Sequence, residues 1–472
     1  MRLNGLNTIE DFSNQDILDV LNLAKSFREN LRGYSDLLAG YIMASLFFEP
    51  STRTRGSFES AMKRLGGQTI TTSDVRGSSI EKGESLADTI RVWSGYCDLM
   101  VMRHPWEGAS NLAESYSQVP VINAGDGGHE HPTQTLCDLF TLREEHGTLD
   151  GLRVVLCGDL KNGRTVHSLT FALLRFGAQL IFVPGEGLGL PDHIKRRIGS
   201  VYGTPIEKVK PVDLDLGALF RGGGPPSKDG TDIDAVYMTP SRPHQLAIYQ
   251  EDVPRNMTYS KDSVDLYFTR HQKERDSGSP RKSYPKVSRQ ALRRKGFSKA
   301  MIMHPLPRVD EISTELDEDP RSRYFEQARN GVPVRMALLA LLLRQKPWSD
   351  SHANNATKFT SGFLVAQLEG VNCDNLNCVS QKEPQNCDGK IVVHQGASNW
   401  FLCKYCEREV HVSAYVYKGK KIYHDIQQLE VKSYEQLSRI RFYSDWAEAE
   451  SHGLTRAHEE SKDRSKVKEV GF

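Results

Sequence analysis

The sequence predicts an α/β protein with two parallel-sheet domains, followed by a small β-rich module at the C-terminus. Two observations predict the sheets: an apolar run passes into a helical pattern at residues 41–65, and again at 151–176. A buried strand followed by a helix is the repeating unit of a parallel sheet. A third observation sets the C-terminus apart, because four of the eight cysteines form two tight pairs there.

The first unit carries an unusual turn between its strand and its helix. Tyr41 to Phe48 is a continuous apolar run, and Phe58, Met62 and Leu65 have the i, i+4, i+7 spacing of a helix face. Between them lies Glu49-Pro50-Ser51-Thr52-Arg53-Thr54-Arg55-Gly56-Ser57. Helix N-termini present unpaired N–H groups and partial positive charge, to which this string adds hydroxyl and guanidinium donors. The string therefore predicts a phosphate-binding turn.

A plainer interpretation remains open for this turn. A serine and threonine before a helix are ordinary N-cap residues, and the arginines would then face solvent. The pattern Gly-x4-Gly-Lys of nucleoside triphosphate sites is absent, so a nucleotide triphosphate is not the expected ligand.

The second unit repeats the strand-helix order. Residues 151–159 read as a strand that ends in a turn, and residues 164–176 follow a helical pattern; 180–183 and 300–304 add strands to the same sheet. The helix expected at 133–145 joins the halves, which places the active site in the cleft between them. Gly158 and Gly163 lack the G-x-G-x-x-G spacing of a dinucleotide site.

Length and charge exclude several classes of function. The chain has 472 residues, 38% of them hydrophobic, and a net charge of +1, which suits two or three domains without a general bias toward nucleic acid. The longest apolar run, 336–343, is too short to cross a bilayer, and no hydrophobic signal region begins the chain. We therefore expect a soluble, cytoplasmic protein with no membrane partner.

The remaining segments are less regular. Signals weaken over 185–265, where 221–227 is expected to be a flexible loop. A leucine-rich helix is expected at 334–344, and 346–360 is polar enough to be a linker. Residues 447–470 are dense in charge and predict a frayed tail.

The paired cysteines predict a metal site. Cys373-x4-Cys378 and Cys403-x2-Cys406 supply four thiolates in two close pairs, the arrangement of a structural zinc, one per chain. The alternatives are four free thiols or a nucleic-acid-binding zinc ribbon. The charge around the pairs is mixed rather than basic, so we expect no nucleic-acid partner.

Five further strings, in order, complete a recognisable set: Arg103-His104-Pro105, His131-Pro132-Thr133-Gln134, Gly158-Asp159-Leu160-Lys161-Asn162-Gly163-Arg164, Arg270-His271-Gln272-Lys273-Glu274 and His304-Pro305-Leu306-Pro307-Arg308. With the phosphate-binding turn, they make residues 1–345 resemble the catalytic chain of the aspartate carbamoyltransferase family. The two cysteine pairs also resemble the zinc domain of that family's regulatory chain.

The resemblance implies a domain division. It gives a carbamoyl phosphate-binding domain at 1–132, an interdomain helix at 133–150, an aspartate-binding domain at 151–330, a C-terminal helix at 331–346, a linker at 347–368, a zinc-binding regulatory-like module at 369–425 and a charged tail at 426–472. The regulatory family's nucleotide-binding domain is missing, so no nucleotide-effector site is expected.

The family reaction moves a carbamoyl group from carbamoyl phosphate to L-aspartate in pyrimidine biosynthesis. By resemblance, the phosphate is bound by Ser51, Thr52, Arg53 and Thr54. The carbonyl oxygen meets Arg103, His131 and Thr54, and the carbamoyl amide meets Gln134 and the backbone of Pro305 and Leu306, with a cis bond before Pro307. The expected catalytic residues are Arg53, Thr54, Arg103 and His131.

The resemblance also assigns the aspartate side and the assembly. Arg164 and Arg270, assisted by Gln272, match two carboxylates. Ser78 and Lys82 would come from a neighbouring chain of a homotrimer or higher homo-oligomer, and Lys82 would also contribute to aspartate binding. If the departing phosphate accepts the amine proton, no protein base is needed.

Two rival functions are the alternatives to this assignment. Ornithine carbamoyltransferases place a cysteine after the late histidine, whereas this chain has His304-Pro305-Leu306-Pro307-Arg308, so a dicarboxylic substrate is favoured. A catalytically silent scaffold or partner-binding zinc protein is the other alternative. The complete set of site residues argues against it, since a decayed site would have lost at least one.

Overall fold

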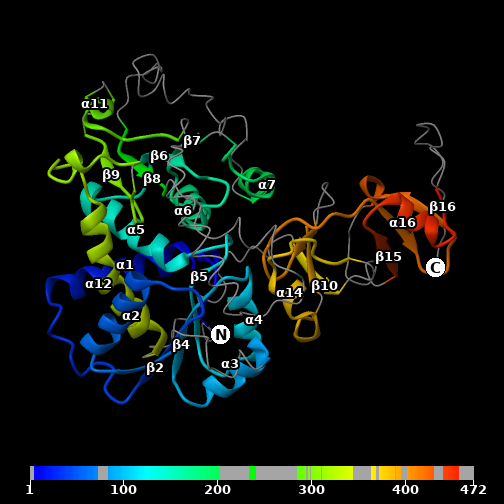
Figure 1. The fold of residues 1–472 in the computed structure, drawn as a ribbon, viewed down its shortest axis with the longest axis horizontal. Helices are drawn as coiled ribbons and strands as arrows, with labels where there is room; N and C mark the ends of the chain where they lie inside the picture. Colours follow the sequence, from blue (N-terminus) through cyan, green and yellow to red (C-terminus); the bar gives the residue numbers. More distant parts are fainter. Residues whose placement is uncertain are drawn as a thin grey trace, which may run out of the picture. The chain divides into compact units, whose positions relative to one another are not determined.

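The computed structural model describes residues 5–72, 83–185, 187–201, 233–240, 284–293, 296–297, 299–309, 311–343, 363–367, 371–388, 390–394, 401–429 and 439–456. The chain divides into two compact units (Figure 1). The first contains Met1–Phe359 and Leu376–Asn386, and the second contains Thr360–Asn375 and Cys387–Phe472.

The first sheet of the first unit is parallel, as predicted. Its strands are β1 (Gly5–Leu6), β2 (Ile42–Phe47), β3 (Gln68–Thr72), β4 (Leu99–His104) and β5 (Val121–Asp126), in the order β1-β5-β4-β2-β3. Its helices are η1 (Ile9–Asp11), α1 (Asn14–Glu29), α2 (Thr52–Arg64), α3 (Leu86–Ser94) and α4 (Ala109–Tyr116). Strand β2 is buried from Met43 onward, because a parallel strand has neighbours on both edges and helices over its faces.

The second sheet is also parallel, with the order β7-β6-β8-β9. Its strands are β6 (Arg153–Gly158), β7 (Gln179–Pro184), β8 (Ala235–Met238) and β9 (Met301–Met303). The helices here are α6 (Arg164–Arg175), α7 (Asp192–Val201), α11 (Arg289–Leu292) and η2 (Thr314–Leu316). The prediction of two parallel-sheet domains is therefore confirmed. The loop expected at 221–227 lies outside the described residues.

Two helices join the halves: α5 (Pro132–His146) and α12 (Tyr324–Leu343). Helix α12 packs against α1, α2 and α5, and one continuous apolar core includes Leu139 of α5 and Leu338 of α12. The leucine-rich helix begins at Tyr324 rather than at the expected 334, with Pro333 inside it. Proline usually interrupts a helix, so the sequence pattern favoured a later start. Burial of this helix against three others outweighs that preference.

The second unit is rich in strands, as predicted. Strands β10 (Phe363–Gln367), β11 (Lys390–His394) and β12 (Phe401–Cys403) form an antiparallel sheet. A second sheet has the order β15-β13-β14-β16, from β13 (Ala414–Tyr417), β14 (Ile422–Asp425), β15 (Ile440–Tyr443) and β16 (Thr455–Arg456), with η4 (Ile426–Gln428) and α16 (Trp446–Ser451). The segment Leu376–Asn386 of the first unit contains α14 (Val379–Lys382) and η3 (Pro384–Asn386).

The structure differs from the sequence prediction at 426–472. Instead of a charged tail, residues 440–456 form β15, α16 and β16. The physical reason is that Phe442 and Tyr443 are buried by pairing of β15 with β13, while the charges of Asp445 and Glu450 remain exposed. Residues 457–472 lie outside the described residues. In the part of the chain that is described, no helix has the length and apolar character that crossing a membrane requires.

Candidate active site

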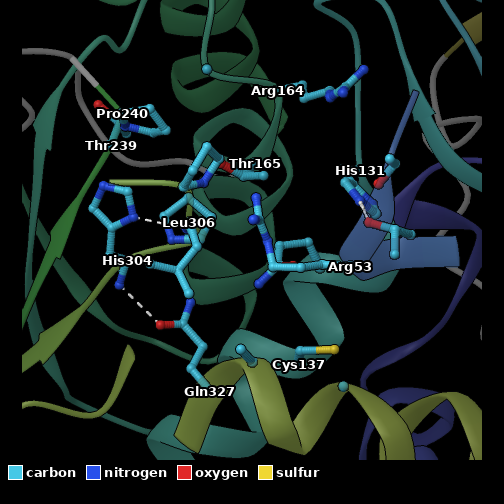
Figure 2. A pocket seen from close by; sticks show the side chains of 18 of the residues that line it. Arg53, His131, Cys137, Arg164, Thr165, Thr239, Pro240, His304, Leu306 and Gln327 are labelled. Atoms are coloured by element: carbon cyan, nitrogen blue, oxygen red, sulfur yellow. Dashed lines mark hydrogen bonds between the residues drawn. The ribbon is translucent and has the colours of Figure 1, made fainter. Parts of the chain in front are cut away.

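A cavity of about 490 Å³ lies between the two sheets of the first unit. Its lining comes from the turn after β2, the ends of β4 and β8, the starts of α5 and α6, the loop after β9, and α12. Figure 2 shows these side chains converging from both halves. Carboxyl ends of parallel strands are the usual place for ligands in α/β sheets. The predicted cleft between the halves therefore contains a cavity.

The Ser51–Thr54 turn forms one wall of this cavity. Ser51 is the N-cap of α2, but its hydroxyl makes no capping hydrogen bond, so it is not used by the helix. Arg53 extends into the cavity (Figure 2) and forms no ion pair with a described residue. Burial lowers the pKa of Arg53. The N-cap interpretation is thus correct for the backbone position. Thr52 and Arg53 are exposed, as that interpretation expects, but they also line the cavity.

His131 lies beside this turn as a neutral imidazole. Its Nε2 is 3.5 Å from Oγ1 of Thr54, and its Nδ1 is 3.4 Å from Oγ1 of Thr133. Burial, followed by the positive charges of Arg164, Arg103 and Arg335, holds the pKa of His131 well below its usual value. A neutral ring at this position can donate one hydrogen bond to an oxygen without carrying charge.

Arg103 and Arg164 share a partner that the sequence analysis did not assign. Oε1 of Glu49 accepts hydrogen bonds from Arg103 at 2.5 Å and from Arg164 at 3.0 Å. Burial by itself would raise the pKa of Glu49, but the two guanidinium groups lower it to about 2. The only available signal was its place at the end of a strand, inside the phosphate-binding string.

The loop after β9 supplies the opposite wall. Nδ1 of His304 accepts from the backbone N–H of Leu306 at 2.8 Å, and Nε2 of His304 lies 2.8 Å from Oε1 of Glu311 (Figure 2 shows the first bond). The peptide bond between Leu306 and Pro307 is cis, as expected. These contacts turn the backbone of Pro305 and Leu306 toward the cavity lining.

All the expected site residues that the structure describes in the first unit line this cavity: Ser51, Thr52, Arg53, Thr54, Arg103, His131, Gln134, Arg164, Pro305 and Leu306. Ser78, Lys82, Arg270 and Gln272 lie outside the described residues. Helix α12 contributes four lining residues that the sequence analysis missed, Gln327, Ala328, Gly331 and Arg335. The buried Arg335 guanidinium lies 5.0 Å from the ring of Phe58.

The site combines the N-terminus of a helix with neutral and charged donors. Such a site can hold a phosphate and direct preorganised donors toward an oxygen that gains negative charge.

The four expected metal ligands come together. Cys373, Cys378, Cys403 and Cys406 are buried, with their sulfur atoms all within 4.8 Å of one another. Sulfur atoms of Cys373 and Cys406 are 3.6 Å apart, too far for a disulfide bond. A tetrahedral zinc with Zn–S bonds of about 2.3 Å requires sulfur separations of about 3.8 Å. The donor set therefore fits a structural zinc.

The segment Leu376–Asn386 is attached to the first unit by several hydrogen bonds. The carboxylate of Glu383 accepts from the backbone N–H of Leu86 at 2.5 Å, at the start of α3. Nδ2 of Asn377 donates to the carbonyl of Pro105 at 3.0 Å. Buried carboxylates at a helix N-terminus pair with unpaired N–H groups. Glu383 therefore helps to fix the first turn of α3.

Comparison with known proteins yields three family matches. The model described as "Aspartate/ornithine carbamoyltransferase, carbamoyl-P binding domain" matches residues 5–144. The "Aspartate/ornithine carbamoyltransferase, Asp/Orn binding domain" matches 259–342. The "Aspartate carbamoyltransferase regulatory chain, metal binding domain" matches 365–415. Catalytic-type and regulatory-type domains therefore occur in one chain.

Individual relatives agree with these matches. The chain is 43% identical over 341 residues to the aspartate carbamoyltransferase catalytic subunit of Methanocaldococcus jannaschii, covering 72% of this chain and 97% of the relative. It is 43% identical over 338 residues to the same subunit of Thermoplasma acidophilum, covering 71% and 97%.

Solved structures show the same relationship. The catalytic subunit of M. jannaschii aspartate transcarbamoylase matches with a TM-score of 0.55 and 39% identity, over 73% of this chain and all of that one (100%). Aspartate transcarbamoylase from Trypanosoma cruzi, in complex with aspartate and phosphate, matches with a TM-score of 0.56 and 35% identity, over 72% and 96%.

Proposed function

The chain belongs to the aspartate carbamoyltransferase family, and from this premise we propose that it transfers the carbamoyl group of carbamoyl phosphate to the amine of L-aspartate. The products are N-carbamoyl-L-aspartate and phosphate, and the reaction serves pyrimidine biosynthesis. One observation carries the proposal: a single cavity gathers the Ser51–Thr54 turn, Arg103, His131 and Gln134.

The phosphate group binds at the start of α2 in this proposal. The hydroxyls of Ser51 and Thr52 and the first N–H groups of the helix surround it, and Arg53 supplies the positive charge. Since Arg53 has no ion pair among the described residues, its guanidinium does not have to leave a carboxylate to bind the phosphate.

The carbonyl oxygen faces Thr54, Arg103 and His131. As the amine of aspartate attacks, negative charge develops on this oxygen, and donors already in place stabilise it. A neutral His131 is suited to that role because it donates a hydrogen bond without forming an ion pair with the phosphate. The carbamoyl amide then contacts Gln134 and the backbone carbonyls of Pro305 and Leu306.

The bond changes need no protein base. A C–N bond forms, the C–O bond to phosphate breaks, and the departing phosphate takes the amine proton. The protein contributes position and charge. Arg164, Arg270 and Gln272 hold the two carboxylates of aspartate, while Ser78 and Lys82 enter from a neighbouring chain of a homotrimer or higher homo-oligomer.

The C-terminal cysteines belong to the same proposal. Cys373, Cys378, Cys403 and Cys406 hold one structural zinc per chain, which organises the module proposed at 369–425. The proposed domain division also includes catalytic domains at 1–132 and 151–330, joined by the helix at 133–150.

Product analysis tests the proposal directly. Purified protein is incubated with carbamoyl phosphate and either L-aspartate or L-ornithine, and carbamoylated product and phosphate are both measured. We expect product with aspartate alone. Product with ornithine would overturn the assignment of the second substrate, and no product with either would favour a silent scaffold.

A further inference from the structure

One carboxyl group lies behind two glutamines of the cavity wall. Asp138, on α5, is completely buried and is not itself part of the lining. Its Oδ1 accepts a hydrogen bond of 2.7 Å from Nε2 of Gln134, one turn earlier on α5. The same oxygen accepts a second bond of 2.7 Å from Nε2 of Gln327 on α12. Both glutamines line the cavity.

This arrangement decides which end of each amide faces the cavity. Because Oδ1 of Asp138 accepts both hydrogen bonds, each glutamine turns its NH2 group toward Asp138 and its oxygen away. The Gln327 oxygen then accepts from the backbone N–H of His304 at 2.9 Å, the bond drawn in Figure 2. The Gln134 oxygen has no hydrogen-bond partner among the described residues, so it is available to a ligand.

From this geometry we propose that Asp138 is a positioning residue that makes the amide side of the site an acceptor. This inference rests on the proposed function. Asp138 orients Gln134 so that the amide oxygen of Gln134 faces the carbamoyl NH2 group directly. Through Gln327 it holds the backbone of His304, and with it the loop whose carbonyls at Pro305 and Leu306 face the same group.

The consequence is selectivity for an acyl phosphate with N–H donors. Acetyl phosphate has the same phosphate and carbonyl as carbamoyl phosphate, but a methyl group replaces NH2. A site built from acceptors is left with unpaired oxygens when the methyl group binds. Asp138 therefore contributes to discrimination between these two molecules without touching either.

The local electrostatics are compatible with this role. Burial raises the pKa of Asp138 to about 7, although the hydrogen bonds from Gln134 and Gln327 oppose the shift. A neutral carboxyl group still has one carbonyl oxygen that accepts. Asparagine keeps an acceptor oxygen in the same shape, whereas leucine has a similar volume and no acceptor.

A second pair on the same helices provides a matched control. Nδ2 of Asn330 donates to Oγ1 of Thr141 at 3.0 Å, three residues further along α12 and α5 than Gln327 and Asp138. Both residues are buried, and neither lines the cavity. Thr141→Val removes a buried bond between the same helices without touching the glutamines.

The experiment measures KM for carbamoyl phosphate and the inhibition constant of acetyl phosphate in wild type, Asp138→Leu, Asp138→Asn and Thr141→Val. We expect Asp138→Leu to raise the KM for carbamoyl phosphate about tenfold while the acetyl phosphate constant stays within about threefold. We expect Asp138→Asn to retain most of the wild-type preference for carbamoyl phosphate over acetyl phosphate, and Thr141→Val to retain all of it.

Equal weakening of both ligands in Asp138→Leu, or unchanged selectivity, would overturn the inference. Circular dichroism reports whether each variant folds. If Asp138→Leu does not fold, Gln327→Met is measured in its place. This substitution removes the hydrogen bond from the backbone N–H of His304 and must raise the KM for carbamoyl phosphate with the same selectivity. A wild-type protein with no carbamoyl transfer would contradict the proposed function instead, so the two failures are distinguishable.

Discussion

The carboxylate of Glu49 lies 3.0 Å from Nη2 of Arg164 and thereby connects the two halves of the catalytic unit. Glu49 follows a strand of the first sheet, and Arg164 begins the first helix of the second half. The same Glu49 oxygen accepts from Arg103. Two cations expected to meet the substrates are therefore held by one carboxylate in this structure.

We expect Glu49→Gln to weaken catalysis strongly. The substitution keeps the shape but removes the charge that pairs with Arg103 and Arg164, leaving two largely buried guanidinium groups without it. Without this charge the two guanidinium groups are no longer held in place at the cavity, and misplacing a positioning group by about 1 Å can cost about 100-fold in rate, so kcat/KM should fall by about two orders of magnitude. Steady-state kinetics with aspartate as the varied substrate measure this.

Glu145→Gln is the matched control for that experiment. Glu145 pairs with Arg323 at 2.8 Å, but this pair is considerably more exposed to solvent than the Glu49 pairs. Exposed pairs contribute about 0–1 kcal/mol, so the control should change neither kcat/KM nor the melting temperature appreciably. Equal effects of the two substitutions would contradict a special role for Glu49.

Neutrality of His131 leads to a prediction for the pH profile. The pKa of His131 is held well below its usual value by burial and by nearby arginines. Its ring therefore stays neutral as the pH falls through 6.5, and kcat should show no step there that depends on His131. His131→Ala should lower kcat about 100-fold. His146→Ala, at the far end of the same helix, is the control and should leave kcat unchanged. A step in kcat near pH 6.5 that is present in wild type and absent in His131→Ala would refute the prediction.

Buried histidines also predict loss of stability in acid. Burial lowers the pKa of His104 to about 3, below the value of about 6.5 in the unfolded chain. The unfolded state therefore binds a proton first, and this contribution to stability is lost as pH falls below 6.5, at about 1.4 kcal/mol per pH unit until pH 3. Denaturant unfolding between pH 7 and 5 measures the slope.

His104→Asn should reduce that slope, because asparagine keeps an acceptor for the backbone N–H of Trp106 but does not titrate. His452 is exposed, and His452→Asn should leave the slope as it is. If His104→Asn has the wild-type slope, the acid sensitivity comes from other groups.

The cysteine cluster predicts one zinc per chain. Elemental analysis should find it in wild type, and Cys403→Ser should lose most of it because a tetrahedral site needs all four ligands. Cys387→Ser is the control, since Cys387 is outside the cluster. Removal of the metal with a chelator should unfold the module, seen in circular dichroism and tryptophan emission. Unchanged spectra after complete removal would rule out a structural role.

The proposed sharing of active sites between neighbouring chains predicts complementation between inactive chains. Lys82→Ala lacks the residue proposed to enter the site of a neighbouring chain, and Arg53→Ala lacks a residue of the chain's own cavity. Mixed oligomers contain some sites with both residues intact, so activity should reappear after the two proteins are dissociated and reassembled together. Each variant reassembled alone is the control, and failure to recover activity in verified mixed oligomers would argue for self-contained sites.

Local chemistry explains why much of the site could be predicted. Ser51 to Thr54 are consecutive, and the strand before them and the helix after them follow from short-range apolar spacing. The cysteine pairs are likewise close in sequence. The resemblance to a known family supplied the more distant members, including Arg103 and His131, which the structure places in the same cavity.

Long-range partners could not be predicted in this way. Glu49 meets Arg103 and Arg164 over separations of 54 and 115 residues, and Asp138 meets Gln327 over 189 residues. No local pattern encodes such pairs, because each depends on how two elements pack.

The sequence by itself determined the two parallel-sheet domains, the Ser51–Thr54 turn at the start of a helix and the two cysteine pairs, since each depends on residue type and spacing within a short stretch. Only the tertiary structure decided which carboxylate holds which arginine, which way the glutamine amides point, and that 440–456 folds into a sheet. Burial is the physical reason. It changes the pKa of a side chain, selects its partner and outweighs local propensity, and it is known only once distant segments are packed together.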